Sequence, residues 1–95
     1  MLKFNFITDD SHGWLEVKLD EEPCASLFAD GSGYINGNTI YLEEDGEAPK
    51  FLEHLKNEGI EYSITEKNYN GQWYGRAYAR NVRGIHYNNT NENEG

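Results

Sequence analysis

A helical pattern over residues 45–59, DGEAPKFLEHLKNEG, limits the folds that are open to this chain. Asp45 can cap the helix, Pro49 fits a first turn, and Gly59 permits a left-handed residue after the last turn. The spacing places apolar and charged side chains on opposite faces. The pattern predicts one principal helix over about 46–58. We expect Phe51, Leu52 and Leu55 to point inward and Lys50, Glu53, His54 and Lys56 to point outward.

Segments before this helix alternate between apolar and polar residues, which is typical of half-buried strands. FNFIT (4–8) and WLEVKL (14–19) form a predicted hairpin with a five-residue connection. GYI and NTIYLEE form a second predicted hairpin, because Asn36-Gly37 between them is a strong two-residue turn signal. The chain before the principal helix is therefore expected to supply four antiparallel strands.

The segment after the helix alternates in the same way. We expect IEYSITEK (60–67) to pair with a return strand at 72–80 across a tight turn at Asn70-Gly71. Ile60, Tyr62 and Ile64 should then point inward. Together the patterns predict an α+β fold, in which a mostly antiparallel sheet of five to six strands carries one principal helix.

Two further segments complete the predicted single domain. DEEPCASLF (20–28) is compatible with a short helix, with Asp20 as its cap and Leu27 and Phe28 packing inward. NNTNENEG (88–95) contains no large apolar side chain, and we predict that it is a disordered polar tail. The domain is thus expected to span residues 1–87.

Cysteine and histidine usage gives no support to a metal site or a cofactor. Cys24 has no companion cysteine, and His12, His54 and His86 are too scattered for metal-ligand spacing. No apolar run approaches the ~20 residues that cross a bilayer, and the N-terminus lacks the apolar run of a signal peptide. We therefore expect a cytoplasmic protein with no membrane partner.

The formal charge of −9 is unevenly distributed along the chain. Residues 1–66 carry a net −11, residues 67–87 a net +4, and the tail a net −2. An acidic protein is repelled by phosphate and by anionic lipid. The charge therefore disfavours nucleic acid as a partner and favours a protein with a basic surface.

Three segments resemble a group of small uncharacterised proteins that are common in bacteriophage and plasmid genomes. They are DDSHGWLEV (9–17), YLEED (41–45) ahead of a helix that carries Phe51-Leu52, and Gly59-Ile60 before the next strand. The C-terminal segment QWYGRAYARNVRG keeps a basic and aromatic character but departs in detail from the family's ending. The resemblance implies an accessory gene of a mobile element. Many such small acidic proteins inhibit host factors.

The acidic side chains are the leading candidates for a binding surface. The alternative interpretation is that Asp45 only caps the helix and that Glu43 and Glu44 are solvated residues at the end of a strand. We hypothesise a non-enzymatic protein that binds and inhibits a host protein, such as a nucleic-acid-handling defence factor, in the host cytoplasm. The candidate partner-binding residues are Asp9, Asp10, Glu21, Glu22, Glu43, Glu44, Asp45 and Glu47.

A basic and aromatic face provides the main alternative. On a strand, Tyr74, Arg76, Tyr78 and Arg80 share one face, where tyrosines can stack bases and arginines can hold phosphates of a single strand. The same arginines could instead pair with the protein's own carboxylates, or the edge could bind a protein. A small-molecule or nucleotide-sequestering protein, with a pocket built by a homodimer, is a third hypothesis. No catalytic residue is predicted, because His12 lacks an obvious nucleophile.

Overall fold

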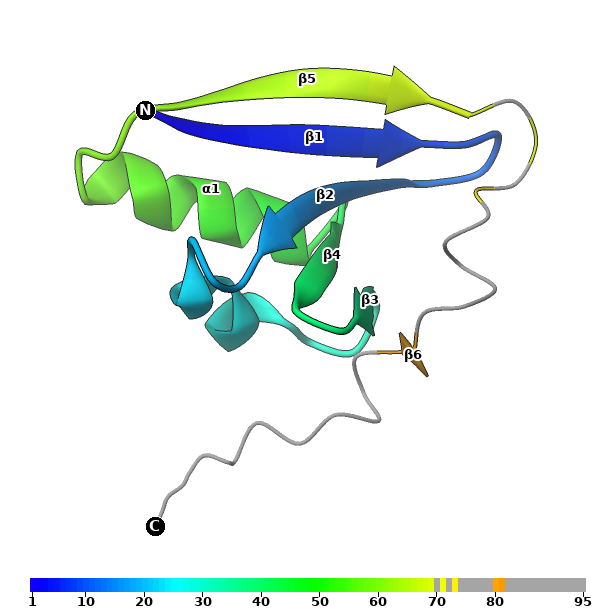
Figure 1. Cartoon of the computed structure of the whole chain (residues 1–95), viewed down its shortest axis with the longest axis horizontal. Coiled ribbons are helices and arrows are strands. Elements are labelled where there is room, and N and C mark those ends of the chain that lie inside the picture. The colour runs from blue at the N-terminus through cyan, green and yellow to red at the C-terminus, as the bar shows by residue number, and fades with distance from the viewer. Residues whose placement is uncertain (70, 72, 74–79, 82–95) are drawn as a thin grey trace, which may run out of the picture.

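The computed structural model describes residues 1–69, 71, 73 and 80–81. The elements follow the order β1, β2, η1, β3, β4, α1, β5 and β6, where η1 is a short 3₁₀ helix (Figure 1). Their bounds are β1 Leu2–Thr8, β2 Gly13–Lys18, η1 Pro23–Phe28, β3 Tyr34–Asn36, β4 Thr39–Glu43, α1 Glu47–Asn57, β5 Tyr62–Asn68 and β6 Arg80–Asn81.

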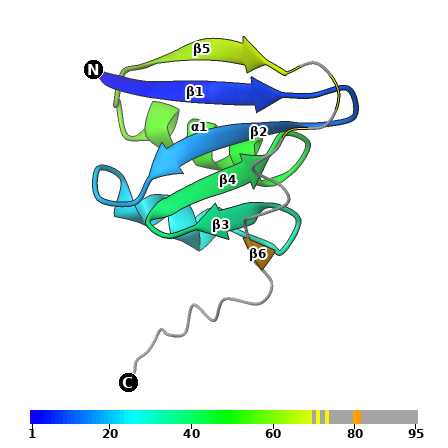
Figure 2. The same cartoon turned by 45° about the vertical axis from the view of Figure 1, so that its right-hand side comes forward.

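An open sheet of five strands, in the order β5-β1-β2-β4-β3, forms one layer, and the two-residue β6 extends it beyond β3. Figures 1 and 2 show α1 and η1 together on one side of this sheet. The predicted α+β class with one principal helix is thus confirmed, as are the two hairpins β1–β2 and β3–β4. The sheet is mixed rather than mostly antiparallel, however, because β5 pairs in parallel with β1.

The connection through α1 explains the parallel pair. The chain leaves β4, passes through α1 on one side of the sheet, and returns as β5 at the outer edge of β1. A helical crossover of this kind brings the next strand back in the same direction as the one it left. The predicted antiparallel hairpin of 60–67 with 72–80 is therefore wrong where it can be examined: Arg80 pairs with Ile35 of β3, at the opposite edge from β5.

Hydrophobic residues gather on both sides of the sheet. The main core lies between the sheet and the helices, where Leu15, Ile40, Leu42, Phe51 and Leu55 are fully buried. A second cluster lies on the opposite face, where the buried Trp14 and Trp73 pack with Ile7. Alternating side chains of β2 supply both layers, because successive residues of a strand point to opposite faces.

The helix α1 follows the predicted bounds closely, but its start differs from the prediction. Gly46 is the N-cap and makes no side-chain capping bond. Asp45 was expected to cap the helix; instead its backbone N–H donates to the Glu43 carboxylate at 3.0 Å. At the other end Gly59 has φ +72, so the predicted left-handed residue is confirmed.

Three apolar side chains that were predicted to point inward are exposed. Leu27 is 78% exposed, because η1 begins only at Pro23 and buries Ala25 instead. Ile64 is 41% exposed, because β5 lies at the edge of the sheet. Ile60 is 36% exposed and lies before β5, in the connection from α1. Phe28 and Tyr62 do pack against the main core, as predicted.

Two parts of the sequence-based prediction lie outside the described residues. They are the polar tail at 88–95 and most of the return strand at 72–80. In the part of the chain that the structure describes, none of the helices has the length and apolar character required to cross a membrane.

Candidate functional site

One end of the sheet gathers many of the exposed carboxylates. There β1 finishes, β4 finishes, and α1 begins within a few residues of the end of β4. Backbone pairing joins the two turns, because Glu43 lies opposite Trp14 and the Glu44 N–H donates to the Gly13 carbonyl at 3.1 Å. Strands β1 and β4 are separated only by β2, which sets them about 10 Å apart. We call this region the acidic end and define it as Asp10, Asp30, Glu43, Glu44 and Asp45.

Glu47 lies beneath the acidic end and is completely buried. Its Oε2 accepts the N–H groups of Asp30 and Gly31 at 2.6 and 3.3 Å, and its Oε1 accepts the Glu43 N–H at 2.9 Å. Glu47 therefore joins the loop before β3, the end of β4 and the first turn of α1. Glu47 was predicted to be a partner-binding residue; the structure instead buries its side chain, and both of its carboxylate oxygens accept backbone N–H groups of the protein itself.

The buried position also changes the ionisation of this carboxyl. Burial raises the pKa of Glu47, and the neighbouring Asp30 adds to the effect, whereas the N–H groups of Glu43 and Asp30 oppose it. The pKa of Asp30 is lowered, chiefly by the hydrogen bond from the Ser32 hydroxyl, which lies 2.6 Å from Oδ1. The pKa values of the two neighbouring carboxyls are thus shifted in opposite directions, and Asp30 is the exposed one of the two.

Asp9 is the second candidate residue that is buried, at 8% exposure. Its Oδ1 accepts the backbone N–H groups of Ser11 and His12 at 2.9 and 2.8 Å, which closes the β1–β2 turn. Its Oδ2 accepts the Trp73 N–H at 2.9 Å and so holds Trp73 against the second cluster. Asp9 was also predicted to be a partner-binding residue; the structure instead buries it and gives it a structural role.

Glu21 and Glu22 lie at the other end of the sheet. They follow the C-terminal end of β2, whereas the acidic end adjoins its first residue, Gly13. The length of β2 separates the two groups by roughly 17 Å. This distance is about twice the screening length of ~8 Å at physiological salt. The eight predicted partner-binding residues therefore do not form one surface.

The carboxylates that remain at the acidic end are accessible to a partner. Asp10, Asp30, Glu44 and Asp45 are exposed, and Glu43 is half-buried. Lys50 in the first turn of α1 and Lys67 near the end of β5 are the described basic residues at this end. The charge of Lys50 contributes to the lowered pKa of Asp30. The acidic end thus keeps an excess of negative charge among the described residues.

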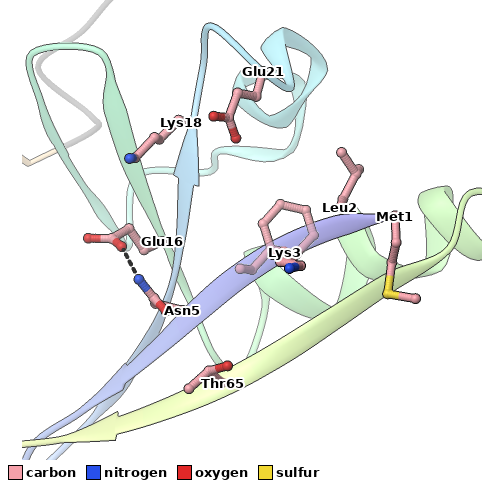
Figure 3. A pocket seen from close by; sticks show the side chains of 9 residues that line it. Met1, Leu2, Lys3, Asn5, Glu16, Lys18, Glu21 and Thr65 are labelled. Atoms are coloured by element: carbon pink, nitrogen blue, oxygen red, sulfur yellow. Dashed lines mark hydrogen bonds between the residues drawn. The ribbon is translucent and has the colours of Figure 1, made fainter.

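A hollow of about 490 Å³ lies on the opposite face of the sheet from α1 (Figure 3). Lys3 and Lys18 line it together with Glu16 and Glu21, so it carries both signs of charge. Within it the Asn5 amide donates to Glu16 at 2.9 Å. The sequence analysis did not predict this hollow; among its lining residues, alternation along the predicted strand 14–19 placed only Glu16 and Lys18 on a common face.

Aromatic residues on this face are used for packing. The rings of Trp14 and Trp73 lie 4.9 Å apart, and the Tyr41 ring lies 4.6 Å from Trp73. Burial raises the pKa of Tyr41 to about 12, and the Glu16 carboxylate adds to the shift through its charge and a hydrogen bond. Of the predicted alternative binding face, Tyr74, Arg76 and Tyr78 lie outside the described residues, and the side chain of Arg80 is likewise outside them.

Groups that could support covalent or metal chemistry are dispersed. His12 is exposed, and Asp9 contacts its backbone N–H. Burial raises the pKa of the Cys24 thiol, and Glu22 raises it further, which disfavours the reactive thiolate. Within the described ranges, His, Cys, Asp and Glu side chains form no group of three or more that could hold a metal ion.

Comparison with known proteins found no matching family model, no matching curated protein and no matching solved structure.

Proposed function

We propose that this protein acts as a non-enzymatic binding protein whose acidic end docks on a basic surface of another protein. The observation that carries the proposal is the pairing of the Glu43-Glu44-Asp45 segment with the start of β2, beside the Asp9-Asp10 turn. Carboxylates from two separate turns are thereby held within about two strand spacings of each other. Their fields add over a distance comparable to the screening length.

Rigid support strengthens the proposal. The buried Glu47 fixes the loop before β3 and the end of β4 through three backbone hydrogen bonds, and the buried Asp9 fixes the neighbouring turn. A binding surface whose backbone is already fixed loses less conformational freedom when a partner docks. The sequence resemblance adds a context to the proposal, in which the partner is a host protein that a mobile element inhibits.

Affinity capture from a bacterial lysate with matched charge variants tests this function. The test variant combines Asp10→Lys, Glu44→Lys and Asp45→Lys, all at exposed positions of the acidic end. The control combines Glu21→Lys, Glu53→Lys and Glu58→Lys, which are exposed elsewhere and change the net charge equally. We expect one protein to be captured by the wild type and by the control, and to be lost with the test variant.

Equal retention by both variants would exclude the acidic end as the binding surface. Equal loss from both would show that capture depends on net charge alone. Circular dichroism of each variant establishes that the fold is unchanged, which the exposure of all six positions leads us to expect.

A further inference from the structure

β5 is a seven-residue strand, and no other described strand pairs with its outer edge. β5 ends the strand order of the sheet, and six of its seven residues are exposed. Its register with β1 continues without a bulge from Tyr62 to Asn68, and it contains no proline. Natural edge strands are usually shortened, bulged or covered, because their unpaired N–H and C=O groups can pair with another strand.

Hydrogen bonds at the two ends of β5 identify the backbone groups that point outward. The Glu61 carbonyl accepts the Leu2 N–H at 3.0 Å, and the Tyr69 N–H donates to the Thr8 carbonyl at 2.8 Å. Residues 61 and 69 therefore face β1. Because the direction alternates along a strand, the intervening odd-numbered residues face β1 as well. The N–H and C=O groups of Tyr62, Ile64 and Glu66 point away from the sheet.

We propose that this edge pairs with β5 of a second copy of the chain, antiparallel, with Ile64 facing Ile64 across a two-fold axis. In this register Tyr62 lies opposite Glu66 of the second copy, and the outward backbone groups form about six hydrogen bonds. The exposed Ile64 side chains then cover each other on the helix side of the sheet. Paired strand residues have Cβ atoms about 4.5–5.5 Å apart, close enough for this contact.

Charge on the other side of the sheet favours the same register. Lys67 lies opposite Ile7 of β1 and therefore shares the face away from α1, and Glu61 shares that face by strand alternation. With Ile64 on the axis, Glu61 of each copy lies opposite Lys67 of the other. The dimer thus has two symmetric pairs of opposite charge, directly across the strands.

Neighbouring registers lose this complementarity. With the two-fold axis at Thr65, the two β5 strands share more backbone hydrogen bonds. That register, however, places Ile64 opposite a Glu66 carboxylate and Lys67 opposite Ser63. An axis at Ser63 places Glu61 opposite Thr65 and leaves Lys67 beyond the paired strands. An axis at Glu66 places two like charges opposite each other, which is destabilising. Among these registers, only the one centred on Ile64 places Ile64 opposite Ile64 of the second copy and Glu61 opposite Lys67.

A charge-exchange experiment tests the dimer and its register together. The purified wild-type chain is measured by light scattering after size exclusion, from low concentration up to about 1 mM, the range of weak association. We expect the mass to double from 10.9 kDa. Glu61→Lys alone and Lys67→Glu alone should each shift the midpoint of dimerisation to at least tenfold higher concentration, since each variant places like charges across the strands.

An equimolar mixture of these two variants should recover dimerisation as a heterodimer. In the mixture every position 61 again faces an opposite charge at position 67. One of the two variants is uniformly labelled with ¹⁵N, so that native mass spectrometry distinguishes the heterodimer from both homodimers by its mass. A wild-type chain that keeps the monomer mass at the highest concentration would overturn the proposal. A mixture that dimerises no better than its components would overturn the register.

A proline variant provides a second, independent measurement. Ile64→Pro removes an N–H that points away from β1, so the fold is expected to survive and the dimer to be lost. The acidic-end variant described above leaves β5 unchanged and should dimerise like the wild type. The dimer and the proposed function can therefore fail separately.

Discussion

Single buried carboxylates account for much of the local order around the acidic end. Glu47 and Asp9 were predicted to be partner-binding residues, yet each is buried and accepts three backbone N–H groups that would otherwise be unpaired donors. The sequence shows the density of acidic residues but not which of them turn inward. That choice depends on where β4, the loop before β3 and α1 meet, which no local pattern specifies.

Replacing Glu47 by alanine should strongly destabilise the protein. Glu47→Ala leaves three N–H groups without their acceptor in a buried site, and each unsatisfied buried donor costs about 1–3 kcal/mol. We expect the free energy of unfolding, measured by urea titration, to fall by about 3 kcal/mol or more. Glu44→Ala at the exposed surface is the control and should change it by at most about 0.5 kcal/mol. Similar unfolding midpoints for the two variants would contradict this role of Glu47.

Tyr41 provides a prediction on pH. Its pKa is raised to about 12 from an ordinary value of 10, so the folded protein retains a proton that the unfolded chain releases. The stability that this proton contributes is complete below pH 10 and is lost as the pH rises through about 12. An absorbance titration of tyrosine ionisation should therefore show a component near pH 12 that Tyr41→Phe removes. Persistence of that component in Tyr41→Phe would refute the assignment.

At the scale of elements, the patterns before α1 and within it were predicted correctly. The two hairpins and α1 depend on local alternation, on a two-residue turn and on helical spacing, and all of these are present. The turn is shifted by one residue from the predicted Asn36-Gly37, because Asn36 belongs to β3 and pairs with Thr39, which leaves Gly37-Asn38 as the turn. The partner of β5 was not predictable in the same way. It is determined by the path of α1 across the sheet, which brings β5 to β1 rather than to the segment that follows it.

Close packing around Gly33 predicts that substitution of this glycine strongly lowers the free energy of unfolding. A Cβ at this buried glycine would meet the Tyr41 carbonyl oxygen and the Glu47 carboxylate, so the segment at Gly33 would have to move away from β4 and from the start of α1. We expect Gly33→Ala to lower the free energy of unfolding by about 1–3 kcal/mol.

Gly46→Ala is the matched control for this prediction, because its Cβ would lie 3.5 Å from Asp30 in ordinary contact. Replacing an N-cap glycine should cost about 1 kcal/mol or less. Thermal unfolding of the two variants compares them directly. A larger loss of stability for Gly46→Ala than for Gly33→Ala would contradict the importance of the close approach of Gly33 to Tyr41 and Glu47.

At the scale of the whole molecule, the fold divides the acidic residues into separate groups. The net −11 of residues 1–66 was visible in the sequence, but the charge is divided between buried positions, the acidic end and the opposite end near Glu21. Contiguity of charge is a property of the folded chain. For the candidate site, the sequence therefore predicted the residue types and the Glu43-Glu44-Asp45 segment, while the structure selects Asp10 and Asp30 as its neighbours.

The central claim is that the acidic end, rather than net charge, binds the partner. The most direct test is the affinity of the purified chain for its captured partner, measured by calorimetry at about 50 and about 200 mM salt, a range over which the screening length shortens. We expect the variant with Asp10→Lys, Glu44→Lys and Asp45→Lys to lose about tenfold or more in affinity at the lower salt, equivalent to about 1.4 kcal/mol. The control with Glu21→Lys, Glu53→Lys and Glu58→Lys should stay within about threefold of the wild type. An equal loss in the two variants would contradict the account.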